Sequence, residues 1–252
     1  QSQQLALQLD EQMVLEEQFI SYHDLELVPR IQAAEEEIAD TITDLRQHID
    51  ARSTLQLLAT LTKANEAKSQ VFTLITQNAE GIGMALKDYN EVGNSMTIAL
   101  LSLTNLIDVA ESEALVQGQA LSPNEVLLRN SIHELLTLVD KRTLATQSLY
   151  IGLDFEAFQA MRDSLGELTP TESLLFVIDN PEYLALWQSF MPLWEEFGEL
   201  EEIIAQELSN NVKLKRELKQ RGDLMQTMLH QMVEVSQQSI EQATVYSQTA
   251  IL

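Results

Sequence analysis

The sequence predicts an all-α protein of six helices, two of them very long, which form two stacked four-helix bundles that share the long helices. The first observation is a pair of long helical patterns without strand-like alternation, from about Ser53 to Gly118 and from about Pro181 to Leu252. The second is that eight glycines and five prolines in 252 residues leave few turns, so the elements must be few and long. Because a helix rises about 1.5 Å per residue, each long segment exceeds the diameter of a small domain.

Two shorter helices precede the first long one. Apolar residues at helical spacing, among them Leu5 and Leu9, predict a helix over residues 1–22. Pro29 interrupts the pattern because proline cannot donate a backbone hydrogen bond to a helix. A second helix is predicted to follow and to end near Ile49.

The first long helix is predicted to begin with Ser53 as its N-cap and to end at Gly118. A heptad seam, with alternating spacings of four and three, runs through its second half at Met96, Leu100, Leu103, Ile107 and Ala110. This seam predicts that the helix packs against other helices over much of its length.

Capping signals predict the remaining helices. Ser122 followed by Pro123 is typical of a cap and a first helical residue, and this helix is expected to reach Tyr150. An irregular fifth helix is predicted within residues 155–177. The Asp-Asn-Pro sequence at residues 179–181 predicts the start of the last long helix.

These lengths predict one elongated domain over residues 1–252 with two modules. The module expected near a membrane comprises about residues 1–82 and 216–252, and the distal module comprises about residues 83–215. Both termini are then expected at one end of the domain. Both ends of the sequence are expected to continue into flanking membrane spans, and these spans are the only connection to a membrane that we expect. Within the sequence itself, no run of about 18 apolar residues exists, so no membrane-spanning helix is expected.

Composition excludes several classes of function. The chain has 39 acidic and 15 basic residues and a net charge of −24, which argues against binding nucleic acid or anionic lipid. It has no cysteine, so disulfides and thiol chemistry are impossible. None of the four histidines belongs to a metal-binding spacing, and no catalytic motif is present. No cofactor or metal is expected, and the chain is not expected to be an enzyme.

A basic cluster in this acidic chain is the strongest candidate for a ligand site. Five of the fifteen basic residues fall within nine positions, at Lys213, Lys215, Arg216, Lys219 and Arg221. The predicted layout places this cluster, including Arg216, near the junction of the two modules. Arg221 is expected at the height of the turn that follows the first helix, near Tyr22, His23 and Arg30. Such donors suit a carboxylate ligand. The alternative is a solvated face paired with Glu217 and Asp223 at helical spacings.

The distal module offers further basic candidates at Arg129, Lys141, Arg142 and Arg162, of which Arg129 and Arg142 are taken as site residues. The last long helix also carries an aromatic stripe at spacings of three and four, formed by Trp187, Phe190, Trp194 and Phe197. This stripe is typical of a helix core, although it could also cover a ligand pocket.

The layout of two long and four short helices, together with two local stretches, resembles the helical bimodular sensor domain. This domain is the periplasmic part of some bacterial chemoreceptors and sensor histidine kinases. Residues 15–20, Leu-Glu-Glu-Gln-Phe-Ile, are similar to a stretch in the family's first helix, and residues 232–239, Met-Val-Glu-Val-Ser-Gln-Gln-Ser, look like its last helix before the membrane. The resemblance implies a weakly dimeric receptor for small organic acids. Dicarboxylate-binding members use arginines of the first helix, which has none here, so an amine or a periplasmic binding protein is the alternative ligand or partner.

The resemblance therefore implies the sensor domain of a methyl-accepting chemotaxis receptor in the inner membrane of a Gram-negative bacterium. Such a domain faces the periplasm, binds a small metabolite and transmits a conformational change through its last helix. The first alternative is the same domain on a sensor histidine kinase. The second is a structural helical scaffold without a ligand.

Overall fold

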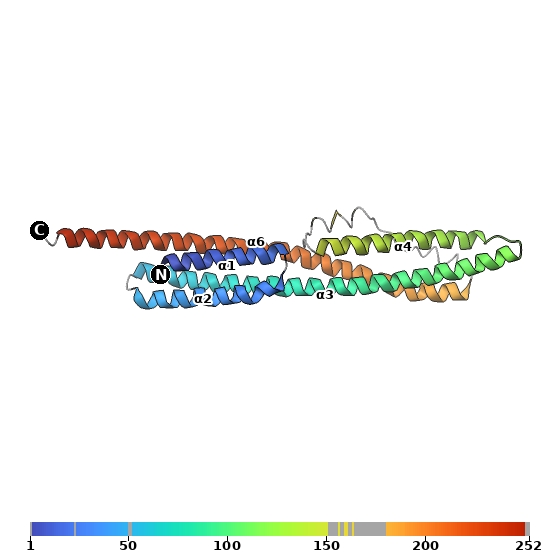
Figure 1. Ribbon diagram of the computed structural model, residues 1–252, viewed down its shortest axis with the longest axis horizontal. Coiled ribbons are helices and arrows are strands. Elements are labelled where there is room, and N and C mark those ends of the chain that lie inside the picture. Colours follow the sequence, from blue (N-terminus) through green and yellow to red (C-terminus); the bar gives the residue numbers. More distant parts are fainter. Residues whose placement is uncertain are drawn as a thin grey trace. The chain divides into compact units, whose positions relative to one another are not determined.

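The computed structural model describes residues 2–22, 24–49, 52–150 and 180–249, together with positions 156, 159, 160 and 163. These residues contain helices and no strand, which confirms the all-α prediction (Figure 1). The elements are α1 (Ser2–Tyr22), the 3-10 turn η1 (Leu25–Leu27), α2 (Val28–His48), α3 (Arg52–Val116), α4 (Pro123–Tyr150) and α6 (Pro181–Thr249). The predicted helix within residues 155–177 lies almost wholly outside the described residues.

Helix ends follow local capping chemistry. The Ser122 hydroxyl accepts a hydrogen bond from the Glu125 amide at 3.2 Å, and the Glu125 carboxylate accepts one from the Ser122 amide at 2.9 Å. This reciprocal pair is a capping box, and it fixes the start of α4 as predicted. Asn180 likewise accepts from the Glu182 amide at 2.8 Å at the start of α6. The predicted N-cap Ser53 is wrong by a small margin, because α3 already begins at Arg52.

The end of α3 is closed by a glycine in the left-handed region. Gly118 has φ 71°, its amide donates to the Leu115 carbonyl at 3.0 Å, and the Gln119 amide donates to Ala114 at 2.8 Å. This pair of bonds is the Schellman arrangement, which satisfies carbonyls that the helix leaves unpaired.

Two glycine substitutions should therefore have opposite effects on stability. Gly118→Ala should lower the free energy of unfolding by about 1 kcal/mol, because alanine disfavours positive φ. Gly81→Ala should raise it by about 0.5–1 kcal/mol, because Gly81 lies inside α3 and a Cβ there has no atom within 4 Å. Urea denaturation of both variants tests this, and the same sign for both would contradict it.

The chain forms two compact units. Unit 1 comprises Gln1–Ala79 and Asn210–Leu252, and unit 2 comprises Glu80–Ser209. The assignment of a membrane-proximal module to residues 1–82 and 216–252 and of a distal module to residues 83–215 stays a prediction.

Unit 1 is built on two apolar clusters to which four helical segments contribute. The first cluster contains Leu5 and Leu9 of α1 together with residues of α2, α3 and α6, such as Ile38, Leu61 and Met225. The second, formed around Phe19 and Phe72, contains these residues: Leu15, Phe19, Ile31, Val71, Phe72, Ile75, Ala79 and Leu218. In α1, α3 and α6, the buried residues between the two clusters are polar or glycine: Gln12, Asn65, Lys68 and Gly222. The beginning of α1 and the end of α6 lie at the same end of this unit (Figure 1).

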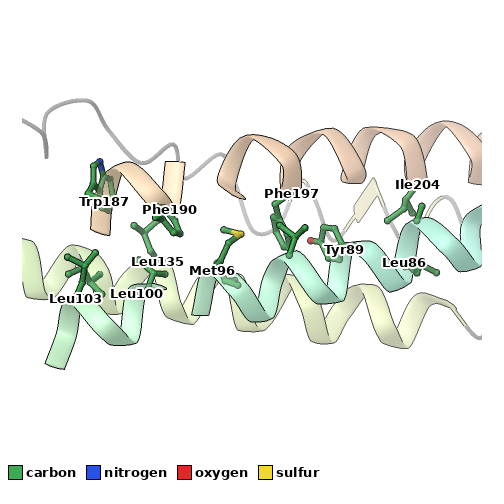
Figure 2. Close-up of a cluster of buried hydrophobic side chains, with 14 of the residues drawn as sticks. Leu86, Tyr89, Met96, Leu100, Leu103, Leu135, Trp187, Phe190, Phe197 and Ile204 are labelled. Carbon is green, nitrogen blue, oxygen red and sulfur yellow. The ribbon is translucent and has the colours of Figure 1, made fainter. Parts of the chain in front are cut away.

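Unit 2 has one core made by α3, α4 and α6 (Figure 2). Met96 and Leu100 of the predicted heptad seam are fully buried in it. The predicted aromatic stripe lies in this core, with Trp187, Phe190 and Phe197 exposed by 2% or less. The sequence-based preference for a core role of this stripe is therefore confirmed.

One described helical segment, Thr54–Val116, contains a stretch of 18 residues with mean hydropathy of 1.2. By length and composition alone it could cross a membrane, which corrects the expectation that no segment qualifies. A core helix of a soluble protein meets the same criterion. That stretch is 33% buried, and Met96, Leu100 and Leu103 of the segment lie in the unit 2 core.

Candidate functional site

A groove of about 680 Å³ lies between α1 and α6 in unit 1. Three residues of the basic cluster line it, Lys215, Arg216 and Lys219. Its carboxylates come from both helices, at Asp10, Glu16, Glu17 and Asp223. The structure thus places part of the predicted basic cluster in a concave site.

Polar contacts fix how α1 and α6 are aligned along the groove. The Lys215 ammonium donates to the Ile20 carbonyl at 3.3 Å, and the Gln226 amide donates to the Asp10 carboxylate at 3.0 Å. Residue numbers therefore rise along α6 as they fall along α1, so the two helices are antiparallel.

Two cations of the groove are available to a ligand. Arg216 and Lys219 are exposed, and neither has a hydrogen bond or an ion pair within the described part of the chain. An arginine guanidinium presents a planar fork that matches a carboxylate, and a lysine ammonium adds three donors. The arrangement can therefore hold an anionic group by charge-assisted hydrogen bonds.

A buried ion pair lies directly behind the groove. Glu16 of α1 lines the groove, and its Oε1 accepts a hydrogen bond from Lys68 Nζ of α3 at 2.7 Å. The side chains of Glu16 and Lys68 are 5% and 1% exposed. Taking both charges out of water is costly, so each depends on the other.

The ion pair belongs to a polar layer that separates the two apolar clusters of unit 1. Glu35 of α2 accepts from the Ser69 hydroxyl at 2.7 Å and from the Gln12 amide at 3.4 Å. Gln12 and Asn65 are buried, and among the described residues their side-chain oxygens have no hydrogen-bond partner. Such a layer fixes the register of packed helices, because a shift would leave its charges unpaired.

Burial raises the pKa of Glu16 above 4.5, although the nearby Lys68 ammonium opposes that rise. Burial also raises the pKa of Glu35, although the hydrogen bond from Ser69 and the charge of Lys68 act to lower it. The folded chain therefore binds protons more tightly than the unfolded chain at these two positions. Their contribution to stability is greatest at acidic pH and falls as the pH rises above 4.5.

The structure separates the other residues predicted for this site. Arg221 does not line the groove, and its guanidinium donates to Glu217 one turn earlier. Since Lys215 lies level with Ile20, Arg221 lies about 9 Å further along α6, away from the turn after Tyr22. The predicted closeness of Arg221 and Tyr22 is therefore wrong, because the alignment of α1 and α6 differs from the expected one.

Two more predicted residues of this site lie on the surface. Tyr22 is 77% exposed and Arg30 is exposed, and neither lines the groove. His23 lies outside the described residues. Of the residues predicted near the turn and the two arginines of the basic cluster, Arg216 alone lines the groove among those described.

In unit 2, the predicted site residues Arg129 and Arg142 both pair with carboxylates. Arg142 Nη1 lies 2.7 Å from Glu201 Oε2, and the two side chains are 12% and 4% exposed. The Tyr89 hydroxyl donates to Glu201 Oε1 at 2.9 Å. Burial, with the negative charge of Glu201, raises the pKa of Tyr89, so this hydroxyl remains a donor. Arg129 pairs with Glu111 at 2.9 Å on the surface.

Sequence reasoning missed the Glu16–Lys68 pair. A signal for it exists on α3, where Asn65 and Lys68 occupy the spacing of the buried seam between Leu61 and Phe72. A lysine at a seam position must find a carboxylate, since an isolated buried charge is too costly. The sequence does not indicate which of the 39 acidic residues supplies it.

No protein-family model matches the chain, and a search of curated proteins gives no match. Among the described residues, no group of three or more His, Cys, Asp or Glu side chains is placed to hold a metal ion.

Proposed function

We propose that the chain is the periplasmic ligand-sensing domain of a transmembrane chemoreceptor and that it binds a small charged metabolite between α1 and α6. The observation that carries this proposal is the pair of cations, Arg216 and Lys219, that face a groove and have no hydrogen-bond or ion-pair partner in the described part of the chain. Concave sites with a few polar groups on an apolar lining are typical of small-molecule binding.

The finer architecture belongs to the same proposal. We propose six helices in two stacked four-helix bundles, with a helix within residues 155–177 completing the second, and a weak homodimer. The two long helices, of 65 and 69 residues, support this arrangement because each contributes to both units. The resemblance to the helical bimodular sensor domain supports the same layout and the inner-membrane location.

Signalling would use α6, because this helix forms the basic wall of the groove and continues to Thr249. A ligand shifts a conformational equilibrium only by its difference in affinity for the two states. A ligand that bridges α1 and α6 favours the alignment that fits it, and α6 carries the shift beyond the groove.

Thermal unfolding of the purified chain with small carboxylates, amino acids and amines tests the proposal. A ligand at about 100 times its Kd should stabilise the chain by about 2.7 kcal/mol, which raises the Tm by several degrees. Arg216→Ala should abolish the shift. Arg221→Ala is the matched control, because it removes an arginine of the same helix that lies outside the groove, and it should leave the shift intact.

Two outcomes would count against this function. If Arg216→Ala and Arg221→Ala lose the ligand-induced rise in Tm equally, the ligand does not bind in this groove. No shift with any compound would instead support a structural scaffold or a site for a periplasmic binding protein.

A further inference from the structure

The groove between α1 and α6 is electrically polarised along its length. Its cations, Lys215, Arg216 and Lys219, lie within five consecutive positions of α6. Asp223 follows one turn later, and Asp10 of α1 lies at that end too, because it accepts from Gln226. The lining of this second end contains two carboxylates and no cation.

The carboxylates at the cationic end do not cancel its charge. Glu16 is already paired with the buried Lys68 at 2.7 Å. Among the lining residues, this leaves Glu17 as the one carboxylate that can offset the three cations at that end. The cationic end therefore keeps a positive excess, and the end with Asp10 and Asp223 keeps a negative one.

The groove also has an apolar lining and is closely packed at Gly222. Met13 and Val14 of α1 and Leu218 of α6 line it. A Cβ on Gly222 would lie 3.2 Å from Met13 Cε, so the missing side chain lets the two helices approach at this point. A ligand in the groove would therefore meet charges at its two ends and hydrocarbon along the lining.

We infer that the groove binds a short ω-amino carboxylate, a molecule with a carboxylate and an ammonium joined by a few methylene groups. This inference rests on the proposed function and names its ligand class. The carboxylate lies at Arg216 and Lys219, and the ammonium lies at Asp223 and Asp10. Asp223 lies roughly 6 Å along the helix from Lys219 and roughly 10 Å from Arg216, at 1.5 Å per residue. With bonds of about 1.5 Å, an extended chain of about four to six carbons reaches between these side chains.

Calorimetric titration of the purified chain with a matched series of compounds tests the inference. The series is glycine, 4-aminobutanoate, 5-aminopentanoate and 6-aminohexanoate, with pentanoate and pentylamine as controls that carry one charge each. We expect 5-aminopentanoate to bind at least about tenfold more tightly than either control, because each charge-assisted contact contributes separately. Glycine should bind weakly, because its charges are too close together to reach both ends.

Charge-neutralising variants assign the two ends of the ligand. Asp223→Asn should weaken 5-aminopentanoate about tenfold and leave pentanoate unchanged, whereas Arg216→Gln should weaken both compounds. Arg221→Gln should change neither, and unchanged circular dichroism should show that the variants fold. Asp223 and Arg216 are exposed, so both substitutions spare the core.

The outcomes separate this inference from the proposed function. Equal affinity for pentanoate and 5-aminopentanoate would overturn the ω-amino carboxylate assignment and leave a carboxylate sensor. No binding in this series, with binding of another metabolite that depends on Arg216, would also overturn the assignment alone. An absence of binding by every small molecule would overturn both.

Discussion

Replacing Lys68 with methionine should lower the free energy of unfolding by about 3–5 kcal/mol at neutral pH, one of the largest effects expected for a single substitution in this chain. Lys68 Nζ lies 2.7 Å from Glu16 Oε1, and both side chains are buried in unit 1. Methionine has a similar length, so the substitution removes the charge and leaves Glu16 without its counterion. Urea denaturation followed by circular dichroism at 222 nm measures the loss.

The loss in Lys68→Met should depend on pH. Burial already raises the pKa of Glu16 above 4.5, and removing the Lys68 ammonium should raise it further, because that charge favours the carboxylate. The folded variant then binds more protons than its unfolded state above pH 4.5, so its stability falls as the pH rises. The difference from the wild type should be larger at pH 8 than at pH 5.

A double variant is the control for this prediction. Lys68→Met combined with Glu16→Gln removes both charges and should recover most of the lost stability, because a neutral pair has no uncompensated charge to bury. If the free energy of unfolding of Lys68→Met alone lies within about 0.5 kcal/mol of the wild-type value, the ion pair does not stabilise unit 1 as expected.

Glu201→Gln should destabilise unit 2 by about 3–5 kcal/mol. Glu201 is 4% exposed by its side chain, accepts from Arg142 at 2.7 Å and accepts from the Tyr89 hydroxyl at 2.9 Å. Glutamine has nearly the same shape, but it lacks the negative charge that compensates the Arg142 guanidinium. It also replaces one of the two acceptor oxygens with an NH2 group, which can only donate. Thermal unfolding and urea denaturation measure the change.

The matched control for Glu201→Gln is Glu111→Gln on the neighbouring surface pair of the same unit. Glu111 also binds an arginine, Arg129, at 2.9 Å, but its side chain is 39% exposed. Because water compensates exposed charges, its loss should cost less than about 1 kcal/mol. Similar costs for the two substitutions would show that burial is not what makes the Glu201 contact important.

Local chemistry explains why most helix starts could be predicted. Ser122 with Pro123 and Asn180 with Pro181 form caps within a few residues, and these starts agree with the prediction. The positive φ of Gly118 closes α3 in the same local manner. Ser53 was predicted as a cap for the same reason, but α3 begins one residue earlier, at Arg52.

The candidate site could be predicted only in part. Arg216 belongs to a basic cluster that is visible in an acidic chain, and it lines the groove. Arg221 belongs to the same cluster and instead bonds to Glu217. The difference depends on the alignment of α1 with α6, which are separated by most of the chain and aligned by contacts such as Gly222 with Met13.

The sequence by itself determined the helical class, the capped starts of α4 and α6 and the acidic surface with one basic cluster, because these depend on composition and on contacts within a few residues. The tertiary structure decided which charges meet. Lys68 and Glu16 are 52 positions apart, and Arg142 and Glu201 are 59 apart. No local pattern selects such partners, since the packing of distant helix faces determines which side chains are buried together. The same packing leaves Arg216 and Lys219 facing a groove.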